Sequence, residues 1–261
     1  MFWAIDMDGV LWRGEDAIAG AATALTRLRE AGSQVCFVTN NSAKTAEGFA
    51  EKLHRLGFDA SPEEVLHAGR AVATLVKPGE RVLSCALEGV AEALADVEAV
   101  CVQVEDIDPF DVEGFDAVII GGHRGQTLER LATAMRAVRA GARLLAPSGD
   151  PMYPSHDGTY LGGGAMTHAV AYSAGVEPTF AGKPFAPMVE LVRTVCGEVS
   201  GVIGDQLSSD GGLARALDVP FVWVQTGVAQ VAPRALDEIE EGVVVVDDFA
   251  AAVDWIIACG D

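Results

Sequence analysis

The sequence predicts an α/β fold built on a parallel β-sheet with helices on both of its faces. Short apolar runs alternate with amphipathic stretches through the first seventy residues, and the same alternation returns between residues 199 and 249. The block between these regions contains strand candidates of its own. Strands that alternate with helices in this way are typical of parallel sheets that are covered on both sides.

The first strand–helix–strand unit is predicted within residues 2–39. Residues 2–5, FWAI, form the first strand candidate, and residues 34–39, QVCFVT, form a second one that is too apolar for an exposed strand. Between them, Leu25 and Leu28 lie on one face of a predicted helix, and Gly32 follows as its C-terminal cap.

Two further helices are predicted before residue 70. Residues 44–57, KTAEGFAEKLHRLG, place three large apolar side chains at helical spacing and end in a glycine. Residues 61–66, SPEEVL, begin with a serine, a proline and, at Glu64, the partner of a capping box. We therefore expect another helix to start at this point.

The remaining strand candidates lie in the middle block and near the C-terminus. The middle block offers RVLSCAL (81–87), AVCVQV (99–104), FDAVIIGG (115–122) and RLLAPS (143–148), with a helical stretch at residues 127–141. The C-terminal region offers VSGVIGD (199–205), PFVWVQTG (220–227) and GVVVVDDF (242–249). Two architectures fit this pattern, which are one long sheet and a core domain that is interrupted by an inserted α/β domain.

Composition excludes several classes of function. The formal net charge of −20 gives a surface that repels phosphate backbones and anionic lipids, so we expect neither nucleic-acid nor membrane partners. No apolar stretch reaches the roughly 18 residues that span a bilayer, and the N-terminus does not resemble a signal peptide, so we expect a cytoplasmic protein. An anionic substrate would need local positive charge or a metal ion in order to bind.

Polar residues follow three of the strand candidates, at the ends where parallel sheets bind ligands. They are Asp6 and Asp8 after the first strand, Thr39, Asn40 and Asn41 after the second, and Asp205 and Asp210 after the run GVIG. Lys183 adds a cation in a chain that has only four lysines. Carboxylates suit Mg²⁺, and hydroxyl, amide and ammonium groups suit phosphoryl oxygens. The set as a whole indicates phosphoryl transfer.

Less specific interpretations exist for the same residues. If the first strand continues, Asp6 and Asp8 point to one face, where two like charges raise a pKa or recruit a cation. The alternative is a solvated turn, because Asp and Gly are common turn residues. The segment Thr39 to Ser42 could merely cap a helix. The indoles of Trp3, Trp12 and Trp223 are expected in the core.

Four short motifs, in this order, resemble those of the haloacid dehalogenase (HAD) superfamily. They are DMDGVLWRG, FVTNNS, GKP and GDQLSSD, and they are most similar to the NagD-like and p-nitrophenylphosphatase-like phosphatases. The resemblance extends into the middle block, through GARLLAPSGD and LGGGAMTHAVAYSAGVEPTFAGKP. It implies a Rossmann-like core with a parallel sheet, formed by residues 1–75 and 181–261, and an inserted α/β cap formed by residues 76–180.

The resemblance also implies roles for the catalytic residues. Asp6 matches the nucleophile that forms an aspartyl-phosphate, and Asp8 matches the general acid and base. Thr39 matches the hydroxyl that binds the transferring phosphoryl group, and Lys183 matches the cation that offsets its charge. We therefore expect Asp6, Asp8, Thr39 and Lys183 to carry the catalysis.

Substrate and metal ligands are implied in the same way. The expected substrate-binding residues are Thr39, Asn40, Asn41 and Lys183, and the expected Mg²⁺ ligands are Asp6, Asp8 through its backbone carbonyl, Asp205 and Asp210. Gln206 and Ser209 replace residues that are common in the family. These two differences bear on which substrate the protein selects.

The resulting hypothesis is a Mg²⁺-dependent phosphatase that acts on a small phosphorylated metabolite, such as a nucleotide, sugar or polyol phosphate. The alternatives are a phosphotransferase or mutase of the same superfamily and a catalytically idle binding domain on the same scaffold. We expect Tyr153 and His156, in the predicted cap, to influence the choice of substrate. The sequence does not decide the oligomeric state, and a homodimer is one option.

Overall fold

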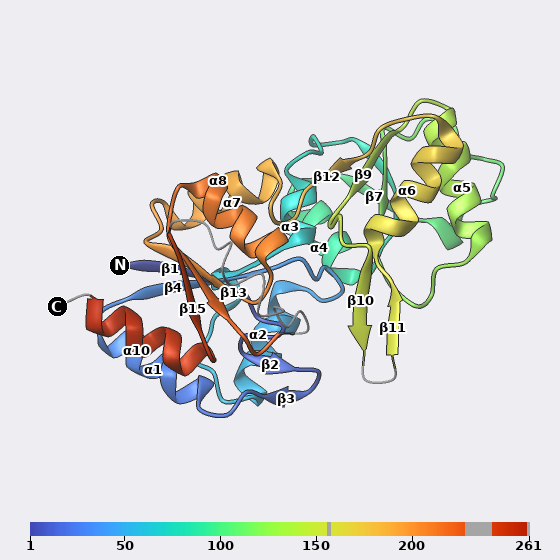
Figure 1. Ribbon diagram of the computed structural model, residues 1–261. Coiled ribbons are helices and arrows are strands. Elements are labelled where there is room, and N and C mark those ends of the chain that lie inside the picture. Colours follow the sequence, from blue (N-terminus) through green and yellow to red (C-terminus); the bar gives the residue numbers. More distant parts are fainter. Residues whose placement is uncertain (156–157, 228–241, 260–261) are drawn as a thin grey trace. The chain divides into compact units, whose positions relative to one another are not determined.

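The computed structural model describes residues 1–155, 158–227 and 242–259 of the chain (Figure 1). His156 therefore lies outside the described residues. The main strands form two separate sheets, and the strand pairs within each sheet are parallel, which confirms the predicted α/β fold. The chain divides into two compact units. The first comprises residues 1–39, 46–66 and 189–261, and the second comprises residues 40–45 and 67–188.

The sheet of the first unit has six strands in the order β15-β14-β13-β1-β4-β5. Their bounds are Phe2–Ile5 for β1, Gln34–Thr39 for β4, Val65–His67 for β5, Gly201–Gly204 for β13, Phe221–Val224 for β14 and Val243–Val246 for β15. Strand β1 pairs in parallel with both β13 and β4, so that Ile5 lies opposite Ile203 on one side and Phe37 on the other. The segments that follow these three strands therefore leave the sheet at the same end, where the carboxyl ends of the strands lie.

Helices cover the sheet of the first unit. They are α1 (Ala21–Glu30), α2 (Ala46–Arg55), α8 (Gly212–Leu217) and α10 (Phe249–Cys259), and α7 (Ala186–Cys196) ends in this unit. Helices α1 and α10, from opposite ends of the chain, lie side by side (Figure 1). Their fully or almost fully buried side chains, including Leu25, Leu28 and Phe249, join the core that also holds Ile5 and Phe37.

The helix that was expected to start at SPEEVL is a single 3₁₀ turn, so this prediction is wrong. The turn η1 covers only Pro62–Glu64, and the chain then enters β5. Val65 and Leu66 are both fully buried. Because β5 completes the edge of the sheet beside β4, strand pairing overrides the helix that the capping pattern alone would start.

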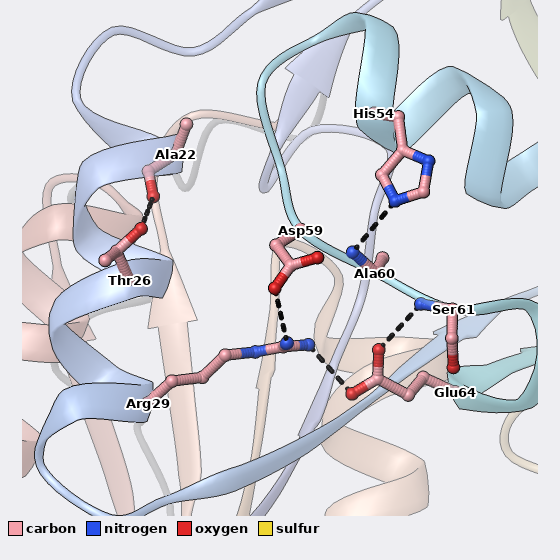
Figure 2. A network of polar contacts seen from close by, with 8 residues as sticks. All are labelled: Ala22, Thr26, Arg29, His54, Asp59, Ala60, Ser61 and Glu64. Carbon is pink, nitrogen blue, oxygen red and sulfur yellow. Dashed lines mark hydrogen bonds and ion pairs between the residues drawn. The ribbon is translucent and has the colours of Figure 1, made fainter.

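The capping pattern itself is present and is tied to helix α1 (Figure 2). The Ser61 N–H donates to Glu64 Oε2 over 2.9 Å, and Arg29 Nη2 donates to Glu64 Oε1 over 2.8 Å. Arg29 Nη1 also lies 3.6 Å from Asp59 Oδ2. One arginine on α1 therefore contacts both Glu64, the last residue of the turn, and Asp59 in the segment before it.

The second unit is built on a five-stranded sheet in the order β12-β9-β8-β6-β7. Its strands are β6 (Arg81–Cys85), β7 (Val100–Gln103), β8 (Ala117–Ile120), β9 (Arg143–Ala146) and β12 (Thr179–Phe180). The first four correspond to the strand candidates of the middle block, and the helix that was predicted at residues 127–141 is α5 (Leu128–Arg139). The sequence pattern also fitted one long sheet, but the structure has two separate sheets instead.

The other helices of the second unit are α3 (Ala68–Ala73), α4 (Glu88–Asp96) and α6 (Gly163–Ala174), and a 3₁₀ turn η2 covers Val104–Asp106. Helix α3 packs beside α4, and α5 packs beside α6. A second apolar core, which includes Leu83, Val118 and Leu144, fills the space between sheet and helices.

Two antiparallel hairpins were not predicted. One joins β2 (Trp12–Arg13) to β3 (Asp16–Ala17) directly after the first strand. The other joins β10 (Met152–Ser155) to β11 (Gly158–Leu161) after β9, with the rings of Tyr153 and Tyr160 stacked 5.7 Å apart. Over the described part of the chain, no helix combines the length and apolar character needed to cross a bilayer.

Candidate active site

Three of the predicted site residues meet at the edge of the first sheet where β1 and β13 end. The carboxylates of Asp6, Asp205 and Asp210 each offer an oxygen, and these oxygens all lie within 4.8 Å of one another. Asp6 directly follows β1, and Asp205 directly follows β13. The parallel pairing of these neighbouring strands brings together residues that are about 200 positions apart in the sequence.

All three carboxylates are buried, with exposed fractions of 7% for Asp6 and 1% for both Asp205 and Asp210. Bringing three acidic groups together out of water is costly unless protons or a cation compensate their charge. Oxygen donors of this kind are the ligands that Mg²⁺ prefers. The residues present therefore fit a divalent cation.

The backbone of two glycines lies very close to the Asp205 carboxylate. A Cβ atom at Gly227 would overlap the Asp205 side chain, and one at Gly9 would lie 2.7 Å from its Oδ2. Gly9 also has a φ of +85°, which suits glycine in the turn after Asp8. The Asp205 carbonyl accepts a hydrogen bond from Trp223 Nε1 over 2.9 Å. These contacts fix the position of the Asp205 side chain.

Asp210 is held by the turn on which it lies. Leu207–Gly211 form a short π-helical turn, η3, before α8. The Gln206 N–H donates to Asp210 Oδ2 over 3.0 Å, and the Asp210 N–H donates to the Gln206 carbonyl over 2.9 Å. The reciprocal bonds between Gln206 and Asp210 turn the buried carboxylate back toward the end of β13.

Asp8 is placed differently from the other three aspartates. Strand β1 ends at Ile5, so strand alternation does not extend to Asp8, whose side chain is exposed and is not part of the cluster. Its Oδ1 accepts a hydrogen bond from Trp12 Nε1 over 2.7 Å. One oxygen of the Asp8 carboxyl is thus held by the hairpin β2–β3.

The second predicted strand delivers Thr39 at its end. Thr39 is the last residue of β4, next to β1 in the sheet, and is 2% exposed. Asn41 is exposed, and its Oδ1 accepts the Ala43 N–H over 2.9 Å, which is a local turn contact. The side chain of Asn41 thus stabilises the backbone turn that follows it.

Asn40 and Lys183 meet within the second unit. Asn40 Oδ1 accepts the backbone N–H of Lys183 over 2.7 Å, and Asn40 Nδ2 donates to the Lys183 carbonyl over 3.1 Å. Lys183 is 3% exposed. Two of the residues predicted from separate motifs therefore contact each other directly.

The sequence did not indicate which other residues form hydrogen bonds with the predicted site residues. Trp3, Trp12 and Trp223 are buried, as expected. Trp12 and Trp223, however, also donate to site aspartates, whereas Trp3 Nε1 has no hydrogen-bond partner among the described residues. Asp150, which accepts a hydrogen bond from Asn40, was missed as well. These tryptophans lie in apolar stretches of the sequence, which do not show where an indole N–H points. No signal in the sequence therefore identifies which of them donates a hydrogen bond to a site aspartate.

Comparison with models of protein families identifies the same family that the sequence motifs resemble. A model of haloacid dehalogenase-like hydrolases matches residues 3–99, and a HAD-hydrolase-like model matches residues 180–252. An acid sugar phosphatase from Staphylococcus aureus is 34% identical over 236 residues, which cover 87% of each chain. The chain belongs to the haloacid dehalogenase-like hydrolases.

Solved structures of this hydrolase family have the same fold. A glycerol phosphate phosphatase from Mycobacterium tuberculosis, in complex with magnesium, matches with a TM-score of 0.82 and 32% identity over 96% of this chain and 75% of its own. A p-nitrophenyl phosphatase from Archaeoglobus fulgidus matches with a TM-score of 0.85 and 25% identity, covering 97% of this chain and 98% of its own. These relatives are named as phosphatases.

Proposed function

We propose that this hydrolase is a Mg²⁺-dependent phosphatase that cleaves small phosphate monoesters, with sugar and polyol phosphates as the first candidates. The observation that carries the proposal is the cluster of three buried carboxylates at the end of β1 and β13. Relatives named for sugar phosphate and glycerol phosphate support the choice of substrate class.

The metal would be held by Asp6 and Asp205, with Asp210 beside them and the Asp8 carbonyl as a further ligand. Magnesium bound there supplies positive charge that offsets the charge of the carboxylates and of the phosphoryl group. The chain contributes rigid oxygen donors, because burial and the close approach of Gly9 and Gly227 fix the Asp205 side chain.

Hydrolysis takes two displacements at phosphorus. In the first, an Asp6 carboxylate oxygen attacks phosphorus, the bond to the leaving oxygen breaks, and Asp8 gives its proton to that oxygen. In the second, Asp8 takes a proton from water as the water attacks phosphorus, and the bond to Asp6 breaks to release phosphate. Thr39 and Lys183 bind the phosphoryl oxygens in both steps.

The testing experiment measures release of inorganic phosphate from p-nitrophenyl phosphate, glycerol phosphate and a sugar phosphate, with Mg²⁺ and with excess chelator. We expect release that depends on Mg²⁺ and that returns when Mg²⁺ is added back. Phosphate that moves to a second hydroxyl without release would favour a phosphotransferase or mutase. No turnover of any substrate with Mg²⁺ would favour an idle binding domain.

A further inference from the structure

A compact polar cluster lies at the end of β9 in the second unit, around Asn40. Asn40 Oδ1 accepts the Lys183 N–H, and Asn40 Nδ2 donates both to the Lys183 carbonyl and to Asp150 Oδ2, the last over 3.1 Å. Both amide hydrogens and one lone pair of Asn40 are therefore engaged. Only an acceptor position remains, and an acceptor does not bind a phosphoryl oxygen. The side chain of Asn40 is thus suited to hold Lys183 rather than the substrate.

Asp150 decides which way the Asn40 amide faces. A carboxylate only accepts hydrogen bonds, so it holds the NH₂ end of the amide and leaves the oxygen for the Lys183 N–H. With the amide reversed, its oxygen would face the carboxylate of Asp150, and its NH₂ group would face the Lys183 N–H. Either contact is unfavourable, and Asp150 therefore sets the orientation on which both bonds to Lys183 depend.

Asp150 is itself fixed by the turn after β9. Ser148 Oγ donates to the same Asp150 Oδ2 over 2.6 Å, and the Asp150 N–H donates to Ser148 Oγ over 3.0 Å. On the other side, a Cβ atom at Gly182 would lie 2.5 Å from Asn40 Oδ1 and from the Pro147 carbonyl. The segments that carry Asp150 and Lys183 approach each other so closely that the Asn40 amide has little freedom between them.

We propose that Asp150 is a positioning residue that acts through Asn40 to hold Lys183. The inference rests on the proposed function in that Lys183 is the cation that offsets phosphoryl charge. Asp150 touches neither substrate nor metal in this assignment. It contributes by keeping the backbone of Lys183 in one place, so that the ammonium group does not have to be positioned during the reaction.

The first test does not depend on activity. Labelling the protein with ¹⁵N-lysine gives four backbone amide signals, from Lys44, Lys52, Lys77 and Lys183. In Asn40→Ala and in Asp150→Ala, we expect the Lys183 amide signal to shift and its hydrogen exchange to accelerate, while Lys52 and Lys77 stay unchanged. An unchanged Lys183 signal in Asp150→Ala would overturn the inference, whether or not the protein is a phosphatase.

Asp116→Ala is the matched control. Asp116 lies in the same unit, and its Oδ2 accepts the Arg81 N–H over 2.8 Å, but it precedes β8 and so lies at the opposite edge of the sheet. We expect no change at Lys183 in this variant. Asp150→Asn keeps an acceptor oxygen, so its Lys183 signal should fall between those of the wild type and Asp150→Ala.

The second test is a double-mutant cycle on the turnover of p-nitrophenyl phosphate and glycerol phosphate. We expect Asp150→Ala to lower kcat about tenfold with little change in KM, equally for both substrates. Because Asp150 acts through Asn40, the double variant should lose no more than Asn40→Ala alone. Losses that multiply in the double variant, or that differ between the two substrates, would overturn the role and indicate direct contact with substrate. A wild type without phosphatase activity would refute the proposed function alone, because the lysine signals still decide the inference.

Discussion

The indole N–H of Trp12 is directed at the carboxylate of Asp8, with 2.7 Å between Nε1 and Oδ1. Trp12 is fully buried and Asp8 is exposed. Lys52 Nζ lies 4.5 Å from the centre of the Trp12 ring and donates to the Gly14 carbonyl over 2.7 Å. The buried ring is thus held from helix α2, and its N–H fixes one oxygen of the Asp8 carboxylate.

Replacing Trp12 by Phe removes this donor but keeps an aromatic ring. If Asp8 protonates the leaving oxygen, the loss should depend on the leaving group. We expect Trp12→Phe to slow glycerol phosphate hydrolysis about tenfold more than that of p-nitrophenyl phosphate, because p-nitrophenolate leaves without a proton. Steady-state kinetics on both substrates measures the ratio.

Trp3→Phe is the matched control for this truncation. Trp3 belongs to the same apolar core as Trp12, but its Nε1 has no hydrogen-bond partner in the described part of the chain. Both variants lose ring volume, so both should melt at a lower temperature than the wild type. Equal losses of activity on the two substrates in Trp12→Phe would mean that Asp8 only accepts the hydrogen bond of the indole and does not protonate the leaving oxygen.

Asp6→Asn tests the nucleophile. The amide keeps the shape of the side chain but lacks the attacking anionic oxygen, so turnover should fall by several orders of magnitude. The variant also removes one of three clustered buried charges, and without metal its melting temperature should equal or exceed that of the wild type. A folded Asp6→Asn protein with full activity would refute the assignment.

Lys183→Ala tests the cation. We expect turnover to fall about a hundredfold, as when one preorganised charge-stabilising group is deleted. The melting temperature should change little or rise, because a lysine that is 3% exposed loses hydration that alanine does not require. Lys77→Ala, at an exposed lysine, serves as the control. Near-normal turnover in Lys183→Ala would exclude the proposed role.

Gly227→Ala tests the geometry of the metal site. The new Cβ would overlap the Asp205 carboxylate and displace it, so Mg²⁺ affinity should fall about tenfold or more in calorimetric titration. Gly211→Ala is the control, because its Cβ would lie an ordinary 3.4 Å from the Phe221 ring although it neighbours Asp210. Equal affinities in Gly227→Ala and the wild type would mean that Asp205 does not bind the metal.

His67 predicts a pH dependence of stability. Burial, together with nearby Arg70, lowers its pKa from 6.5 to about 4, although the Glu92 carboxylate lies 4.0 Å from Nε2. Between these two values the unfolded chain binds a proton that the folded chain does not, so stability falls as the pH drops from 6.5 to 4. At pH 4 the loss from this group is about 3 kcal/mol.

His67→Asn removes the titrating group and keeps an acceptor for the Gly69 N–H, which His67 Nδ1 accepts over 3.2 Å. Denaturant unfolding from pH 7 to pH 4 should show a smaller loss of stability in this variant than in the wild type. The same pH dependence in His67→Asn and the wild type would place the titration elsewhere.

The sequence by itself determined the fold class, the main strands and the set of candidate site residues. Short apolar runs rich in β-branched residues, such as QVCFVT, favour a covered sheet, and polar residues directly after them lie at the carboxyl ends of its strands. Because both signals are local, they predicted β1, β4 and β13 together with Asp6, Thr39 and Asp205. Four motifs in order then sufficed to indicate the family.

The tertiary structure decided how the site residues are placed relative to one another. Strand β1 pairs with β13, from the far end of the chain, and this pairing brings Asp205 and Asp210 to Asp6 and leaves Asp8 outside their cluster. Edge-strand pairing turned the expected helix at SPEEVL into one 3₁₀ turn. The bonds from Trp12 to Asp8 and from Asn40 to Asp150 depend on the direction of single polar atoms, which the packing of distant segments sets and which no local pattern encodes.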